Sequence, residues 1–127
     1  MSRPFLESIA PFFIVADVAR AVQFYREALD FEVRYCEPDS DPFFAIVGRD
    51  AVQIFLKGSA PPQPNCSRQS WAFWDAFVYV ADPDALASEL ASRYVAFHKT
   101  IRDRDDGLRG FEVRDLDGYV IFFGRPR

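Results

Sequence analysis

The stretch "GFEVRDLDGYVIFFGRP", residues 110–126, contains two strand-like runs joined by an Asp117-Gly118 turn. Asp-Gly between apolar runs is a strong hairpin signal, because both residues tolerate the positive φ of tight turns. Residues 119–123, Tyr-Val-Ile-Phe-Phe, are apolar at every position, so both faces of this strand must be covered. A helix can cover one face. The other must meet a second sheet, in the same chain or in a partner.

The chain repeats itself. "FIVADVARAV", from Phe13, resembles "VYVADPDALA", from Val78, and in both an apolar run passes through Val-Ala-Asp into a helical pattern. "FAIVGRDAVQIFLKG", from Phe44, likewise parallels "FEVRDLDGYVIFFGR", from Phe111. Such self-similarity at a fixed distance indicates a duplicated module of about 60 residues.

Each copy is predicted to fold as strand, helix and three strands. Asp17 and Asp82 are good N-caps for the two helices, and Pro83 suits the first position of the second helix. The predicted strands are residues 9–15, 31–37, 43–49 and 52–58 in the first copy, and 72–80, 95–101, 109–115 and 118–124 in the second. This is an α+β fold: a single domain, 1–127, of two βαβββ modules that form a curved mixed sheet around a cleft. Module 1 spans about 8–58, the linker 59–70 and module 2 about 71–126.

The composition narrows the possible partners. The net charge of −4 disfavours a phosphate-neutralising nucleic-acid surface. No basic-then-apolar leader and no 18-residue apolar run is found, which predicts a cytoplasmic protein with no membrane partner. Cys36 and Cys66 have neither metal-ligand spacing nor the number that a disulfide scaffold needs. Aromatic residues make up 17% of the chain, more than a core requires, and this favours a pocket or a subunit contact.

Two segments at opposite ends of the chain, "ADVARAVQFYREALDFEVRY" (16–35) and "GFEVRDLDGYVIFFGRP" (110–126), together with the βαβββ duplication, resemble the vicinal oxygen chelate superfamily of glyoxalases, bleomycin-resistance proteins and dioxygenases. The resemblance implies that a metal, where present, is held by His, Glu or Gln on four strands. The matching positions here are Ala10, Phe55, Asp75 and Phe122. One carboxylate falls short of the three or four ligands of a catalytic metal site. The chain is therefore most similar to the metal-free bleomycin-resistance branch, with no metal and no cofactor.

Side chains alternate across a strand, so residues that share parity with those four positions are expected to face the cleft. The predicted ligand-binding residues are Phe12, Gln53, Phe55, Lys57, Trp71, Asp75, Phe77, Tyr79 and Phe122. Ile14 and Val120 share this parity. The opposite parity, for example Phe13, Ile54, Ile121 and Phe123, suits packing against the helices. The rings would stack on a flat guest, and Asp75 would suit a cationic group.

Three other features receive a structural interpretation. His98, the only histidine, is expected to be a surface or hydrogen-bonded residue and not a catalytic base, and no Ser-His-Asp set is assigned to it. Cys36 is expected to be a partly buried apolar residue. Asp103, Asp105 and Asp106 alternate with Arg102 and Arg104, a pattern that predicts a charged, exposed connection.

The favoured hypothesis is a metal-free small-molecule-binding protein, not an enzyme, that sequesters an aromatic or cationic antibiotic-like ligand. By analogy with the family it would be a homodimer. The alternative is a metal-dependent lyase or dioxygenase-like enzyme with a non-standard metal site, built from Asp75 with His98, Gln53 or Glu112. A third reading is an assembly or regulatory module whose cleft is closed by packed rings.

Overall fold

The computed structural model describes residues 3–65, 71 and 73–127. Its elements, in chain order, are β1 (Phe12–Ile14), α1 (Val18–Leu29), β2 (Glu32–Glu37), β3 (Phe44–Arg49), β4 (Val52–Lys57), β5 (Ala76–Tyr79), α3 (Pro83–Ser92), β6 (Phe97–Asp103), β7 (Leu108–Arg114) and β8 (Val120–Pro126). They form two four-stranded sheets with the orders β1-β4-β3-β2 and β5-β8-β7-β6. In each sheet the first strand pairs in parallel and the other pairs are antiparallel. The predicted α+β fold is confirmed.

Both helices begin where their caps predict. The Asp17 carboxylate accepts a hydrogen bond from the Arg20 N–H at 3.2 Å, and Asp82 accepts one from Ala85 N–H at 3.0 Å. Each bond satisfies one of the amide groups that a helix start leaves without a partner. Two strands are shorter than expected: β1 begins at Phe12, and β5 begins only at Ala76. Cys66 and residue 72 lie outside the described residues.

The core lies between each helix and its own sheet. The side chains predicted to pack against the helices, Phe13, Ile54, Ile121 and Phe123, are all buried. Phe12, one residue away from Phe13, remains 55% exposed. The strand alternation therefore leaves a second face on each sheet, turned away from the helix, which we call the open face.

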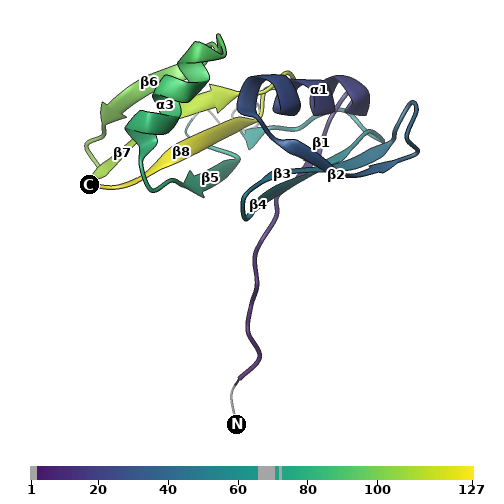
Figure 1. Cartoon of the computed structure of the whole chain (residues 1–127), viewed down its shortest axis with the longest axis horizontal. Helices are drawn as coiled ribbons and strands as arrows, with labels where there is room; N and C mark the ends of the chain where they lie inside the picture. The colour runs from purple at the N-terminus through teal and green to yellow at the C-terminus, as the bar shows by residue number, and fades with distance from the viewer. Residues whose placement is uncertain (1–2, 66–70, 72) are drawn as a thin grey trace.

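The two sheets lie beside each other, and neither is stacked on the other (Figure 1). Side chains of the β7–β8 turn connect them. Tyr119 stacks on Phe13 with ring centroids 4.2 Å apart, and its hydroxyl donates to Ile14 O at 2.7 Å. The Asp117 carboxylate accepts from Ala16 N–H at 2.9 Å. Consequently the open faces of one chain do not close on each other.

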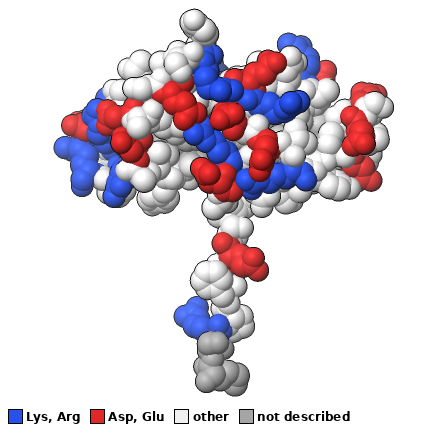
Figure 2. Space-filling model, viewed as in Figure 1, with Lys and Arg blue, Asp and Glu red and all other residues white. Residues whose placement is uncertain are grey.

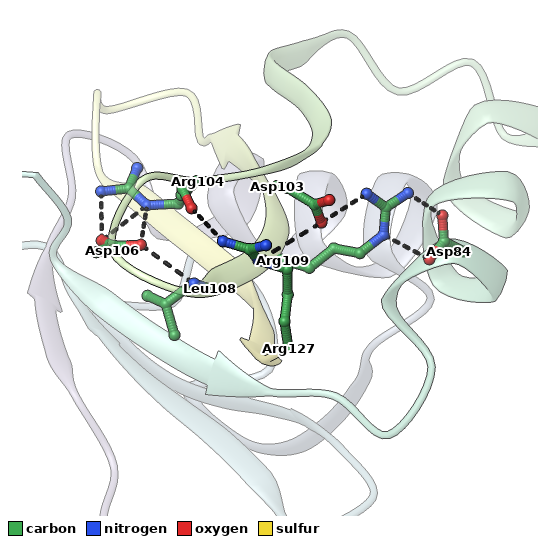
Figure 3. Close-up of polar contacts among 7 residues, drawn as sticks. All are labelled: Asp84, Asp103, Arg104, Asp106, Leu108, Arg109 and Arg127. Atoms are coloured by element: carbon green, nitrogen blue, oxygen red, sulfur yellow. Dashed lines mark hydrogen bonds and ion pairs between the residues drawn. The ribbon is translucent and has the colours of Figure 1, made fainter.

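Charged side chains of both signs are interspersed on the surface shown in Figure 2. Ion pairs join α3 to the β6–β7 hairpin, where Arg109 contacts Asp84 at 2.7 Å and Asp103 at 3.1 Å (Figure 3). The first pair lowers the pKa of Asp84, because the Arg109 guanidinium hydrogen-bonds its carboxylate. These groups are partly exposed, so they contribute little to stability. Among the described residues, no helix is long and apolar enough to span a membrane.

Candidate functional site: the aromatic open faces

The open face of the first sheet carries a cluster of phenylalanines. Phe12 on β1 and Phe55 on β4 are paired across the strands, and their ring centroids lie 6.2 Å apart. Phe44 on β3 contacts both rings, at 6.5 Å from Phe12 and 5.7 Å from Phe55. At the end of β4 the Lys57 ammonium lies 5.5 Å from the centroid of the Phe43 ring. This face offers a ring surface with a cation at its margin.

The open face of the second sheet is centred on Phe122. Its ring is 4.9 Å from the ring of Phe77 and 4.6 Å from that of Trp74, measured between centroids. Phe77 continues the cluster to Tyr79, 4.6 Å away, and Tyr79 is 75% exposed. In contrast, Phe122 is only 1% exposed because the other rings cover it. The predicted ring surface is present here, but much of it is occupied by Trp74.

A polar cluster lies beside Phe122. Glu112 is the cross-strand partner of Phe122 and is 4% exposed. Its Oε2 accepts a hydrogen bond from Trp74 Nε1 at 3.1 Å and lies 3.8 Å from the Arg104 guanidinium. Its Oε1 is 4.0 Å from His98 Nε2. A buried carboxylate with a hydrogen-bond donor and a cation is stable in an otherwise aromatic surface.

Arg104 was expected in an exposed connection, and that expectation is wrong. Its side chain is 11% exposed, and its guanidinium carbon lies 5.0 Å from the Trp74 ring centroid and 5.7 Å from that of Phe122. Attraction between the cation and the π faces, together with burial of the arginine stem, favours this position over solvent. The alternating charges did not predict this stacking, because it depends on how the β6–β7 connection brings Arg104 to Trp74 and Phe122.

The carboxylate of Asp75 is hydrogen-bonded to the backbone. Oδ1 accepts from Asn65 N–H at 2.7 Å, and Oδ2 accepts from Val120 N–H at 2.9 Å. Asp75 N–H in turn donates to Val120 O at 2.8 Å. Asp75 thus fixes the segment that leads into β5 against the start of β8. Trp71, predicted at the mouth of the cleft, is 72% exposed.

The donor set does not fit a metal ion of the kind that the enzymes of the resembled family hold. Phe55 and Phe122 present rings at two of the four matching positions, and Asp75 has both oxygens bonded to backbone N–H groups. Over the described part of the chain, no three His, Cys, Asp or Glu side chains converge in a metal-binding group. His98 and Glu112 are near each other but lack a third ligand of this kind.

Two cavities lie at the junction of the sheets, one of about 470 Å³ and one of about 440 Å³. Tyr79 lines the larger, together with Arg49 and Glu89, which form an ion pair at 2.7 Å. Phe12 and Asp75 line the smaller. The other predicted ligand-binding residues, Gln53, Phe55, Lys57, Trp71, Phe77 and Phe122, line neither. One chain therefore does not gather the predicted residues into either of these cavities.

Sequence reasoning missed three residues of the open faces, namely Phe44, Trp74 and Arg104. Phe44 could have been found, because it pairs with Lys57 in β3–β4 and shares the parity of the open face. Trp74 precedes the strand, so alternation says nothing of its direction.

Two βαβββ halves, each with one helix-covered and one open sheet face, define the class of protein. The chain matches the family model "Glyoxalase/Bleomycin resistance protein/Dioxygenase superfamily" over residues 7–123, and it belongs to this family. No curated protein matches it.

Solved structures agree on the fold. A bleomycin-binding protein from Streptomyces verticillus, complexed with copper(II)-bleomycin, is 24% identical, with 99% of this chain and 100% of that chain covered and a TM-score of 0.72. TnmS3, an antibiotic binding protein from Streptomyces sp. CB03234, is 20% identical (100% and 99% covered, TM-score 0.70). A glyoxalase-related enzyme from Clostridium phytofermentans is 13% identical (98% and 98% covered, TM-score 0.75).

Proposed function

We propose that this protein is a metal-free, cytoplasmic binding protein for a small aromatic or cationic molecule, possessing no catalytic activity. The observation that carries the proposal is the ring surface on each open face, where Phe12, Phe44 and Phe55 on one sheet and Phe77 and Phe122 on the other lie in mutual contact. Ligand sites are mostly apolar with a few polar groups that orient the guest. Similarity to proteins described as binding bleomycin or an antibiotic supports an antibiotic-like ligand.

The working unit we propose is a homodimer. The two open faces of a chain lie on sheets that stand side by side, so a closed cleft needs a second copy (Figure 1). A two-fold arrangement would place the first sheet of one protomer opposite the second sheet of its partner, and so create two equivalent clefts. The described residues before β1, 3–11, form an N-terminal arm. It exposes apolar side chains that a partner could cover, since Phe5, Leu6 and Ile9 are 84–91% exposed. In this arrangement the predicted ligand-binding rings of the first sheet, such as Phe12 and Phe55, and those of the second, such as Phe77 and Phe122, would come from different protomers.

The test combines native mass spectrometry, metal analysis and ligand titration. We expect a dimer of the 14.6 kDa chain, less than about 0.1 metal ion per chain, and saturable binding of planar aromatic cations. Phe12→Ala should weaken that binding about tenfold, because it removes a stacking ring, whereas Leu116→Ala, at a similarly exposed turn position, should not. A monomer that binds none of these compounds would refute the proposal.

The alternative, an enzyme with a non-standard metal site, has one observation in its favour. His98 and Glu112 approach within 4.0 Å on the open face of the second sheet. Near-stoichiometric Zn, Ni, Mn or Fe in the purified protein would support the enzyme, and loss of that metal in His98→Ala would locate the site.

A further inference from the structure

Trp74 lies on the open face of the second sheet as a bound aromatic guest would. Its ring packs on Phe122 with centroids 4.6 Å apart and an interplanar angle of 33°, and it meets the edge of Phe77 at 5.5 Å and 83°. Trp74 precedes β5 and belongs to no strand, so sheet geometry does not impose this position. Without the indole, the buried Phe122 ring would be open to a ligand.

Trp74 also makes a polar contact of the kind that a bound ligand would make. The indole N–H donates to the buried Glu112 carboxylate at 3.1 Å. Glu112 also has His98 Nε2 at 4.0 Å and an Arg104 nitrogen at 3.8 Å, both longer than a hydrogen bond. In the described part of the chain, the indole N–H is thus the one hydrogen-bond donor that reaches the Glu112 side chain. A ligand with an N–H donor in the plane of an aromatic ring could make the same hydrogen bond to Glu112 in place of the indole.

Arg104 also covers the site that Trp74 occupies. Its guanidinium lies over Phe73, Trp74 and Phe122, and it is held there by Asp106 through a 3.0 Å ion pair. Two carboxylates, Glu112 and Asp106, therefore face one guanidinium. Because the carboxylate of Glu112 accepts hydrogen bonds, it favours a donor group on the guest over an acceptor.

We propose that the Trp74 side chain occupies the ligand site in the free protein. The ligand that replaces it is a planar aromatic ring with an N–H donor in the ring plane. On binding, the ligand stacks on Phe122, donates its N–H to Glu112, and displaces the indole. The Trp74 backbone need not move: its carbonyl accepts from Asn65 Nδ2 at 2.7 Å, and rotation of the side chain leaves this bond intact. This inference rests on the proposed ligand-binding function and adds the chemical class of the ligand and a competitor within the chain.

A competitor within the chain lowers the apparent affinity, because only the fraction of molecules with an open site can bind. Trp74→Ala should therefore tighten ligand binding. If Trp74 were instead an ordinary wall of the site, its removal should weaken binding. The direction of the change distinguishes the two roles.

The experiment uses indole and 1-methylindole, which differ at the N–H, with full-length 15N-labelled protein. In a Trp71→Phe background the remaining indole signal belongs to Trp74, and we expect indole to shift it as the contact with Glu112 is lost. 1-Methylindole should bind at least fivefold more weakly, since it leaves the buried carboxylate without a donor. Trp74→Ala should bind indole about fivefold or more tightly than the parent. Trp74→Phe, which keeps the stack and removes the N–H, should lie between them, while Leu116→Ala, 56% exposed in the β7–β8 turn and away from Trp74, serves as the control.

Equal affinity for the two indoles, or weaker binding in both Trp74 variants, would overturn the inference. If indole shifts amide signals around Phe55 but leaves the Trp74 indole signal unchanged, the proposed binding function survives and the role of Trp74 falls. Failure of indole and of every other aromatic probe to bind on either face would remove both.

Discussion

The hydroxyl of Tyr25 donates a 2.7 Å hydrogen bond to Oδ2 of Asp115, and so joins helix α1, on the first sheet, to the β7–β8 turn of the second. Both side chains are buried. Burial raises the pKa of the Tyr25 hydroxyl well above its usual value, and the nearby Asp115 carboxylate adds to this shift. Burial also raises the pKa of Asp115, to about 6, although hydrogen bonds from Tyr25, Asp117 and Tyr119 oppose the change.

Asp115 should make stability depend on pH. Its folded-state pKa, about 6, is above the ordinary 3.8, so the folded chain binds this proton more tightly than the unfolded chain. The resulting stabilisation is fully present below pH 4 and is lost as the pH rises through 6. We expect Asp115→Asn to lose the part of the pH dependence between pH 4 and 7, about 2–3 kcal/mol, in urea unfolding at several pH values. An unchanged pH profile would show that Asp115 titrates normally.

Removal of the Tyr25 hydroxyl should destabilise the protein. Tyr25→Phe leaves the ring in place but deprives a buried carboxyl group of a donor, which costs about 1–3 kcal/mol. Tyr35→Phe is the matched control, because Tyr35 donates to Glu37 at the same 2.7 Å distance but is 46% exposed. There the loss should be below about 0.5 kcal/mol. Similar losses in the two variants would mean that burial does not set the strength of the Tyr25 bond.

The helix starts and the faces of the strands could be predicted from sequence because the signals they depend on are local. Asp17 and Asp82 cap helices through bonds to amides three residues away. The two positions that determine the faces, Phe12 and Phe13, differ in exposure as strand alternation requires. The presence of two similar βαβββ halves was predicted from the internal repeat, which is visible only when distant segments are compared.

The site was harder to predict because it depends on contacts between distant segments. Asp75 was expected to meet a cationic ligand, yet its oxygens are bonded to backbone N–H groups of two other segments. Glu112 has the buried carboxylate instead, and only the register of β7 against β8 places it beside Phe122. Trp74 and Arg104 contact Glu112 and Phe122 from segments outside the strands, where strand alternation predicts no direction for a side chain.

The paired glycines Gly110 and Gly124 should not accept a side chain. A Cβ on Gly110 would lie 2.5 Å from Phe122 Cζ and would also overlap Phe123 O, so the Phe122 ring would have to leave its position on the glycine pair. We expect Gly110→Ala to lower the free energy of unfolding by about 1–3 kcal/mol. Gly107→Asn is the control: it has open space around it, and asparagine tolerates its positive φ of 86°. A neutral Gly110→Ala would mean that both the Phe122 ring and the β8 backbone at Phe123 shift at little cost.

Ile9 should matter for association and not for folding. It is 91% exposed in the single chain, so Ile9→Asp should leave the melting temperature of a monomer unchanged. If a partner covers the N-terminal arm, burial of this side chain contributes about 1.5–3 kcal/mol, and the substitution should weaken the dimer about tenfold or more. Sedimentation measures this directly. Tyr94→Asp, at a site 94% exposed, is the control, and an equal effect of both substitutions would argue against the arm as a contact.

The carboxylate of Asp75 should act on stability and leave ligand affinity nearly unchanged. Val120 N–H is buried with the start of β8 and donates to Asp75 Oδ2 at 2.9 Å, so loss of this acceptor costs about 1–3 kcal/mol. Asp75→Ala should therefore lower the free energy of unfolding by that amount. Asp75→Asn, which keeps one acceptor oxygen and removes the charge, should lower it less. If Asp75 contacted a cationic ligand, Asp75→Asn would instead weaken binding strongly at nearly constant stability. Parallel unfolding and titration of the two variants separate these outcomes, because only the second links the charge of Asp75 to affinity.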